Sequence, residues 1–215
     1  LVASEMCIRD RIAEIYLRGA KPAGNMPEVP VYSLSEDVFD YASPLEHSPG
    51  PLFTVRAKPL PESVRPDRVI VLENVQDPGN VGTLLRSAAA FGFDGVLLSK
   101  GCAAPFAPKT LRASMGAAGR LPVAPVQDLP QALQQLRARG VVCLAAALYH
   151  SRPLDEAPQS YPDGLCVVIG SEGQGLTDET IAACNSTVRI PMTDRVESLN
   201  AGVAGSVLLW HFRGV

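Results

Sequence analysis

The sequence predicts an α/β protein whose main body is a parallel β-sheet with helices on both faces. From residue 67 onward, short apolar segments rich in β-branched residues alternate with longer segments of helical periodicity. The short segments are apolar at nearly every position, which is typical of strands buried on both faces. The chain has 215 residues, 47% of them hydrophobic, which suffices for one large domain or for a domain with a smaller one beside it.

The amino-terminal part predicts a smaller α/β unit. Residues 1–11 show no periodicity, and we expect them to be foreign to the protein or the mark of a truncation, so they carry no fold prediction. Short strands or a helical turn are expected at 29–35, 38–43 and 51–57, within a unit spanning residues 12–60. A Pro-rich stretch at 57–66 is typical of a linker. We therefore predict two domains, at residues 1–65 and 66–215.

The second domain alternates strands with helices. Strands are expected at 68–75, 95–99, 121–126, 141–148, 165–170 and 187–192. Helices are expected at 79–92, 108–117, 128–140, 177–185 and 198–212. In the first helix four apolar residues share an inner face, namely Val81, Leu84, Leu85 and Ala88. Thr177 is the expected N-cap of the fourth helix.

Composition excludes several classes of protein. The formal net charge of -3 argues against a binder of any polyanion, but residues 66–122 hold 6 Lys and Arg against 4 Asp and Glu, which leaves room for a local RNA-binding patch. The five cysteines are scattered, so we expect neither a disulfide framework nor a metal site, and reduced thiols in the cytoplasm. No apolar run approaches the roughly 20 residues that span a bilayer, so no membrane association is expected.

Three polar loops follow predicted strands. The first contains Asn80 and, six residues later, Arg86; the second contains Glu172; the third contains Ser198 and Asn200. Each set alone fits an ordinary role, such as a helix cap, a tight turn or a solvated surface residue. Ligands of open α/β sheets bind at the carboxyl ends of the strands, so three such loops together predict a binding site there.

The glycine-rich stretch GSEGQG, residues 170–175, is not a phosphate loop. Its spacing matches neither the dinucleotide fingerprint nor the P-loop, and no Lys follows it. The carboxylate of Glu172 would also repel a phosphate bound in the same loop. A tight turn and a cofactor loop of another kind remain the two interpretations of this segment.

Taken together, the three loop segments, 72–92, 167–179 and 190–202, resemble the three motifs of the SpoU (TrmH) family of RNA ribose 2′-O-methyltransferases, in the SPOUT class. The resemblance covers residues 68–215 and includes the connecting segment 111–123. Residues 12–60 resemble the later part of the small amino-terminal substrate-binding domain of many members. Many members carry Ser or a larger residue where this chain has Gly202, and we expect this glycine to weaken the first turn of its helix.

The resemblance implies a carboxyl-terminal trefoil knot that binds S-adenosylmethionine, without metal, in a homodimer with the active site near the subunit interface. It also implies a catalytic group of five residues, Asn80, Arg86, Glu172, Ser198 and Asn200. Gly170, Ile190 and Leu199 match family positions that contact the cofactor through backbone or apolar atoms. Arg86 has been assigned as the base in such enzymes, but a guanidinium stays protonated, so a bidentate grip on a phosphate is the easier role.

The activity expected from this resemblance is methylation of a ribose 2′-hydroxyl in RNA, with ribosomal RNA favoured over transfer RNA by the amino-terminal domain. A transfer RNA methyltransferase is the alternative within the same chemistry. An RNA-binding assembly factor that has kept the fold and lost the activity is the alternative from another class. A Rossmann-type oxidoreductase is disfavoured because its fingerprint is missing.

Overall fold

The computed structural model describes residues 12–19, 28–43, 48–56, 68–158 and 160–214. The chain divides into two compact units, Leu1–Ala57 and Lys58–Val215. The segment 1–11 and the proposed linker at 57–66 lie outside the described residues, so the expectations for both stay predictions.

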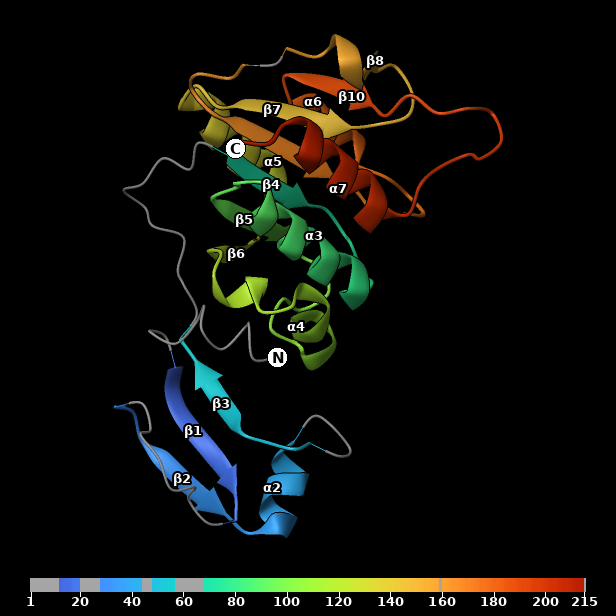
Figure 1. Cartoon of the computed structure of the whole chain (residues 1–215). Helices are drawn as coiled ribbons and strands as arrows, with labels where there is room; N and C mark the ends of the chain where they lie inside the picture. The colour runs from blue at the N-terminus through green and yellow to red at the C-terminus, as the bar shows by residue number, and fades with distance from the viewer. Residues whose placement is uncertain (1–11, 20–27, 44–47, 57–67, 159, 215) are drawn as a thin grey trace. The chain divides into compact units, whose positions relative to one another are not determined.

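The first unit contains a three-stranded sheet in the order β2-β1-β3, counted over its described residues (Figure 1). The central strand β1 (Ile12–Arg18) pairs parallel with β2 (Val31–Leu34) and antiparallel with β3 (Leu52–Val55). A short helix, α2 (Glu36–Ala42), buries Phe39. The strand β1 was missed from the sequence because its buried positions, Ile15 and Leu17, form only a short alternating pattern.

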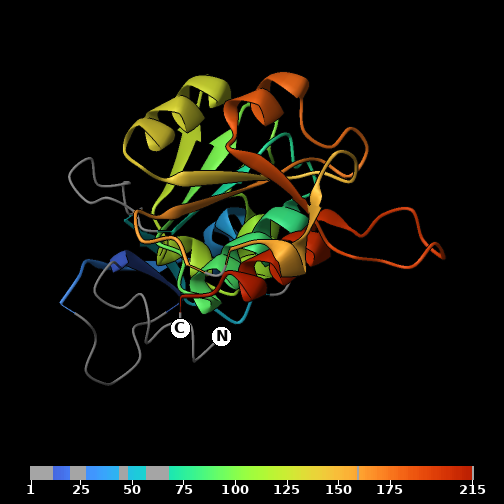
Figure 2. The ribbon, with the colours of Figure 1, turned by 90° about the horizontal axis from the view of Figure 1, so that it is seen from above.

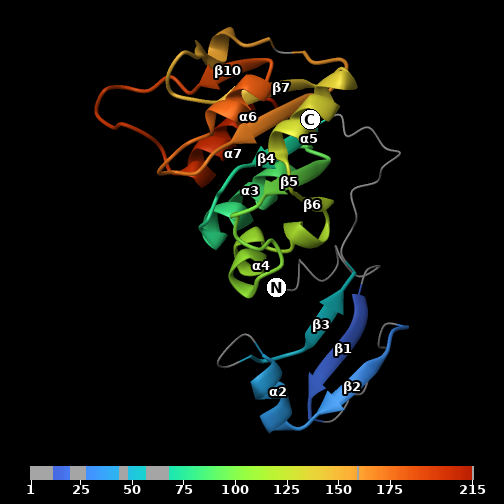
Figure 3. The same ribbon diagram turned by 180° about the vertical axis from the view of Figure 1, so that it is seen from behind.

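The second unit is built on a parallel sheet, which confirms the predicted fold class. Within the described residues it has seven strands in the order β6-β5-β4-β9-β7-β10-β8, and every pairing is parallel (Figure 3). The strands are β4 (Arg68–Leu72), β5 (Gly95–Ser99), β6 (Val123–Val126), β7 (Val142–Ala146), β8 (Arg152–Pro153), β9 (Leu165–Ile169) and β10 (Ser186–Arg189).

Helices cover both faces of this sheet, as Figure 2 shows. On one face α3 (Pro78–Ala90) and α7 (Ala201–His211) pack on a core that includes Ile70 and Leu72. On the other face α5 (Leu129–Ala138) and α6 (Asp178–Ala183) pack on a core that includes Val69 and Val71. Alternate residues of one strand thus enter opposite cores, which is why this strand is apolar throughout. The predicted inner face of α3 is confirmed, since all four of its residues are buried.

Two predicted helices are shorter than expected. The terminal helix was predicted to enter at Ser198, but α7 begins at Ala201 and Asn200 is its N-cap. The helix α4 (Pro108–Ser114) ends early because Met115 and Gly116 adopt left-handed backbone conformations, after which η2 (Ala117–Gly119) forms a 3-10 turn. A second 3-10 turn, η3 (Leu154–Glu156), follows β8.

The carboxyl ends of the parallel strands place three loops near one edge of the sheet. These loops follow β4, β9 and β10, and they lead into α3, α6 and α7 respectively. This is the edge at which ligands bind in open α/β sheets. None of the helices in the described part of the chain is long and apolar enough to cross a membrane.

Candidate functional site

One carboxylate oxygen joins all three polar loops. Glu172 Oε1 accepts a hydrogen bond of 2.8 Å from Asn80 Nδ2, another from Asn200 Nδ2, and a third of 3.1 Å from the backbone N–H of Ala201. The predicted residues Asn80, Glu172 and Asn200 are therefore in direct contact. Among the described residues, no hydrogen bond reaches the other oxygen, Oε2, of the exposed Glu172 side chain, so this oxygen is available to a ligand.

Helix capping fixes the direction of the Asn200 amide and the backbone position of Asn80. The Oδ1 atom of Asn200 accepts from the backbone N–H of Val203 at 3.2 Å, which leaves Nδ2 for Glu172. At the start of α3 the cap is Asp77, whose Oδ1 accepts from the backbone N–H of Asn80 at 2.9 Å. That backbone hydrogen bond, and then the nearby Lys109, lower the pKa of Asp77. The turns that start the two helices thus hold the Asn200 amide and the backbone of Asn80 beside Glu172.

A second carboxylate, which the sequence analysis did not single out, holds the far end of the loop after β9. Glu73 is buried and accepts from the backbone N–H of Thr177 at 2.9 Å, from Thr177 Oγ1 at 2.9 Å and from Thr180 Oγ1 at 2.7 Å. A buried carboxylate needs such partners, so an acidic residue directly after an apolar strand was the signal that could have found it.

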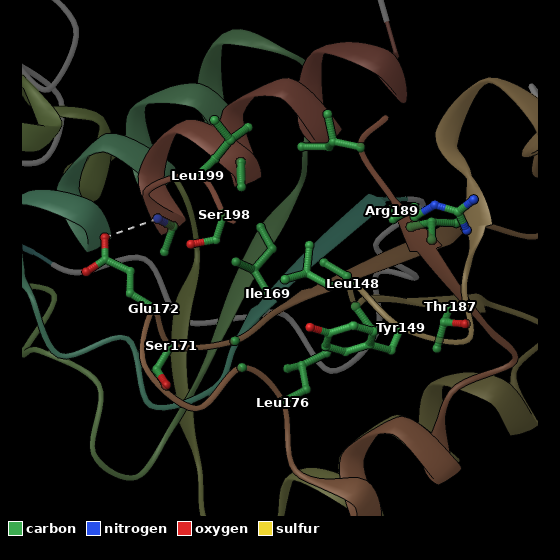
Figure 4. Close-up of a pocket in the computed structure, with 18 of the residues that line it drawn as sticks. Leu148, Tyr149, Ile169, Ser171, Glu172, Leu176, Thr187, Arg189, Ser198 and Leu199 are labelled. Carbon is green, nitrogen blue, oxygen red and sulfur yellow. Dashed lines mark hydrogen bonds between the residues drawn. The ribbon is translucent and has the colours of Figure 1, made fainter. Parts of the chain in front are cut away.

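The loops after β7, β9 and β10 line an open cavity of about 940 Å³ (Figure 4). The predicted cofactor contacts Gly170, Ile190 and Leu199 all line it, and so do Glu172 and Ser198. Figure 4 shows Glu172 and Ser198 toward one side of the pocket and Arg189 at the other. The apolar part of the lining includes Ile169, Leu148, Leu176 and Met192.

A smaller hollow lies against the same loop. It has a volume of about 370 Å³ and is lined by residues 74–77, Asn80 and residues 171–174. Residues 171–174 line both the hollow and the larger cavity, so the two adjoin along this segment.

Arg86 is not part of this hydrogen-bonded group. Its side chain is exposed on α3, and no hydrogen bond or ion pair links it to another described residue. Ser198 is also exposed, and it lies in the loop before α7.

Two glycines explain how the site is so compact. A Cβ on Gly170 would lie 2.3 Å from the backbone carbonyl of Gly175, so the loop could not close with a larger residue. A Cβ on Gly202 would lie 3.0 Å from Asn80 Oδ1. The glycine that was expected to weaken the first turn of α7 is buried there against Asn80.

Comparison with known proteins identifies the relatives of this chain. The sequence model described as the SpoU rRNA Methylase family matches residues 67–210. The chain belongs to the SpoU rRNA methylase family. The sequence is 35% identical over 183 residues to the 23S rRNA (guanosine(2553)-2'-O)-methyltransferase RlmP of Bacillus subtilis, covering 85% of this chain and 72% of that protein. It is 40% identical to an uncharacterized tRNA/rRNA methyltransferase of Synechocystis, covering 67% of this chain but 52% of that protein.

Solved structures of this family share the fold. An RNA methyltransferase of the TrmH family from Porphyromonas gingivalis matches with a TM-score of 0.80 and 33% identity, covering 94% of this chain and 82% of that one. The SpoU methyltransferase AviRb from Streptomyces viridochromogenes, in complex with AdoMet, matches with a TM-score of 0.80 and 20% identity, covering 98% of this chain and 85% of that one. At that identity the second match shows the fold alone.

Proposed function

We propose that this protein transfers a methyl group from S-adenosylmethionine to a ribose 2′-hydroxyl of RNA. The observation that carries the proposal is the convergence of Asn80, Asn200 and the Ala201 N–H on one oxygen of Glu172. This brings the three sequence motifs of a SpoU rRNA methylase into one polar group beside a large cavity. Ribosomal RNA is the preferred substrate in this proposal, supported by the 35% identity to a 23S rRNA methyltransferase.

The larger cavity fits the cofactor in size and chemistry. Its volume of about 940 Å³ lies in the range of small-molecule sites, which is about 300–1,000 Å³. Apolar residues such as Ile190 and Leu199 suit an adenine ring, and the carboxylates of Glu172, Asp178 and Glu197 suit a cation. When bound, the cofactor supplies a methyl group on a positively charged sulfur, which takes the electron pair of the broken bond.

The residues of this chain then orient the weakly acidic hydroxyl. The free Oε2 of Glu172 accepts a hydrogen bond from the ribose, while Asn80 and Asn200 keep the carboxylate in place. Ser198 lines the cavity and reaches the substrate from the third loop. The new bond joins the ribose oxygen to the methyl carbon, and the hydroxyl proton leaves to the base that accepts its hydrogen bond, either Glu172 Oε2 or a phosphate oxygen next to the ribose.

Arg86 grips that phosphate in this proposal. Its guanidinium has no hydrogen-bond or ion-pair partner among the described residues and is exposed on α3. A planar fork of donors matches a phosphate in two parallel hydrogen bonds, so the arginine fixes the position of the neighbouring ribose. In-line placement of the reacting atoms supplies much of the acceleration in such a transfer.

A homodimer, a trefoil knot and an RNA-binding role for the first unit complete the proposal. On α7, Val203 is 49% and Trp210 54% exposed, which is apolar surface that a second subunit would cover. The knot is supported by the match to the SpoU rRNA Methylase family, whose resemblance implied it. The resemblance of residues 12–60 to a substrate-binding domain supports the role of the first unit.

Transfer of tritium from labelled S-adenosylmethionine tests the proposal. Unmodified large-subunit ribosomal RNA made by transcription should accept label, and mapping should place it on a ribose. The same RNA with a 2′-deoxyribose at the mapped nucleotide should accept none. Label on transfer RNA alone would redirect the proposal to that substrate, and no label on either RNA, with intact cofactor binding, would favour the RNA-binding assembly factor.

A further inference from the structure

The smaller hollow beside Glu172 has the lining of a site for a neutral, polar ligand. Its lining includes four carboxamides, those of Asn74, Gln76, Asn80 and Gln174, and two carboxylates, those of Asp77 and Glu172. No Lys or Arg is among its lining residues. A phosphate would meet the carboxylate of Glu172, which has no ion-pair partner among the described residues, and that of Asp77, whose partner Lys109 lies 3.7 Å away and outside the lining, so a phosphate group is disfavoured. A nucleoside, which is uncharged and rich in donors and acceptors, fits this lining.

Several of these polar atoms are available to a ligand. The Nε2 atom of Gln76 donates to Asn74 Oδ1 at 3.2 Å, which leaves Gln76 Oε1 and Asn74 Nδ2 free. The carboxamide of the exposed Gln174 has no hydrogen bond with any described residue. Asn74 has a positive φ of 53°, a backbone conformation that is uncommon outside glycine and that often occurs at functional sites.

The position of the hollow matches what a transfer between two substrates requires. Residues 171–174 line both spaces, so the hollow adjoins the larger cavity along this segment. A cofactor in the cavity and a nucleoside in the hollow would meet near the Asn80–Glu172 hydrogen bond. A volume of about 370 Å³ is at the lower end of the range for small-molecule sites, which starts at about 300 Å³.

We propose that this hollow receives the target nucleoside, turned out of the RNA, and that the amides of Gln76 and Gln174 read the hydrogen-bonding edge of its base. The inference rests on the proposed function and extends it to the choice of nucleotide. Proteins read RNA sequence on bases that are unstacked and splayed out, and carboxamides recognise a base through a paired donor and acceptor. The phosphates stay outside the hollow, where the exposed cations Lys109 and Arg112 lie on α4.

The test compares the wild type with Gln76→Ala, Gln174→Ala and the double variant, using an unmodified transcript of large-subunit ribosomal RNA. The control is Gln134→Ala, which removes an exposed glutamine from α5, a helix on the opposite face of the sheet. Binding of S-adenosylmethionine, measured by calorimetry, should stay within about 3-fold of the wild type in Gln76→Ala and in the control, because neither substituted residue lines the larger cavity. The KM for the transcript should rise about 10-fold or more in the double variant and stay unchanged in the control.

The base itself is tested with four transcripts that differ only at the methylated nucleotide. The wild type should prefer one base, and the double variant should lose about 10-fold or more of that preference. An unchanged KM and preference in the double variant, with an active wild type, would overturn this assignment alone. Weaker cofactor binding on Gln174→Ala, with an unchanged KM and base preference, would also overturn it, since Gln174 lines both spaces and would then act on the cofactor side alone. A wild type that transfers no methyl to any RNA, although it binds cofactor, would overturn the proposed function and this assignment with it.

Discussion

Glu73→Ala should destabilise the second unit, because this buried carboxylate holds the end of the cofactor loop. Three donors lose their acceptor, the Thr177 N–H and the hydroxyls of Thr177 and Thr180. A hydrogen bond to a charged group contributes about 1.5–3 kcal/mol, but without Glu73 the Thr177 hydroxyl can donate to that of Thr180, 3.0 Å away, which offsets part of the loss. We expect the free energy of unfolding to fall by about 3 kcal/mol.

That loss corresponds to a fall in Tm of about 6–12 °C, since 1 kcal/mol shifts Tm by about 2–4 °C in a chain of this size. Glu73→Gln should cost less. Its Oε1 can accept from the Thr177 N–H while Nε2 donates to a threonine hydroxyl, so a loss of about 1 kcal/mol is expected. Because the loop before Thr177 lines the larger cavity, Glu73→Ala should also weaken S-adenosylmethionine binding about 10-fold, roughly 1.4 kcal/mol.

Thermal denaturation and calorimetry measure the two effects on the same preparations. The control is Glu179→Ala, which removes an exposed carboxylate from the first turn of α6 and should cost less than about 1 kcal/mol. Equal Tm values for Glu73→Ala and Glu179→Ala would refute the role assigned to the buried carboxylate. If Glu73→Ala does not fold, Glu73→Gln still tests the role of Glu73, because its Tm should lie below that of the wild type.

Three further outcomes follow from the proposed function. Arg86→Ala should leave the Kd for S-adenosylmethionine within a few-fold of the wild type but reduce the rate of methyl transfer about 100-fold or more. Arg86→Lys should restore little of that rate, because lysine lacks the planar fork of donors. Loss of S-adenosylmethionine binding in Arg86→Ala would contradict the placement of Arg86. Binding of S-adenosylmethionine should persist in a chelator, as no cluster of metal-binding side chains occurs in the described part of the chain, and calorimetry that shows binding abolished by chelation would count against this. Light scattering should show that the wild type is a dimer at micromolar concentration, and Trp210→Glu should shift the monomer–dimer equilibrium toward monomer. A monomeric wild type would contradict the proposed dimer.

The fold of the second unit was predictable because its strands are buried on both faces. In β4 the residues Val69 and Val71 enter one core, and Ile70 and Leu72 enter the other. Each of these positions must therefore be apolar, which makes the strand visible in the sequence. Helix starts were also predictable, because the residue that marks each start is next to it in the sequence: Asp128 and Thr177 cap the turns that directly follow them. Strand β1 was missed because its short alternation carries only two buried side chains.

The members of the polar site were predictable only as separate motifs. Glu172 contacts Asn80 across 92 residues of sequence and Asn200 across 28, and no periodicity encodes contacts of that separation. The same limit applies to Glu73, whose partners lie more than a hundred residues further along the chain. The sequence could suggest that three loops meet at one edge of the sheet, but not which oxygen they share.

The packing of α7 against α3 explains why the shared oxygen belongs to Glu172. A Cβ on Gly205 would lie 2.2 Å from Leu84 Cδ2, and the hydroxyls of Ser87 and Ser206 are 2.8 Å apart, so the two helices lie close together. Their first turns meet as a result, and Glu172 is bonded to both of them. A helix N-terminus presents unpaired N–H groups and favours negative charge, which makes this a suitable position for a carboxylate. The close helix contact, set by small residues such as Gly205 and Ser206, therefore contributes to the geometry of the candidate catalytic group.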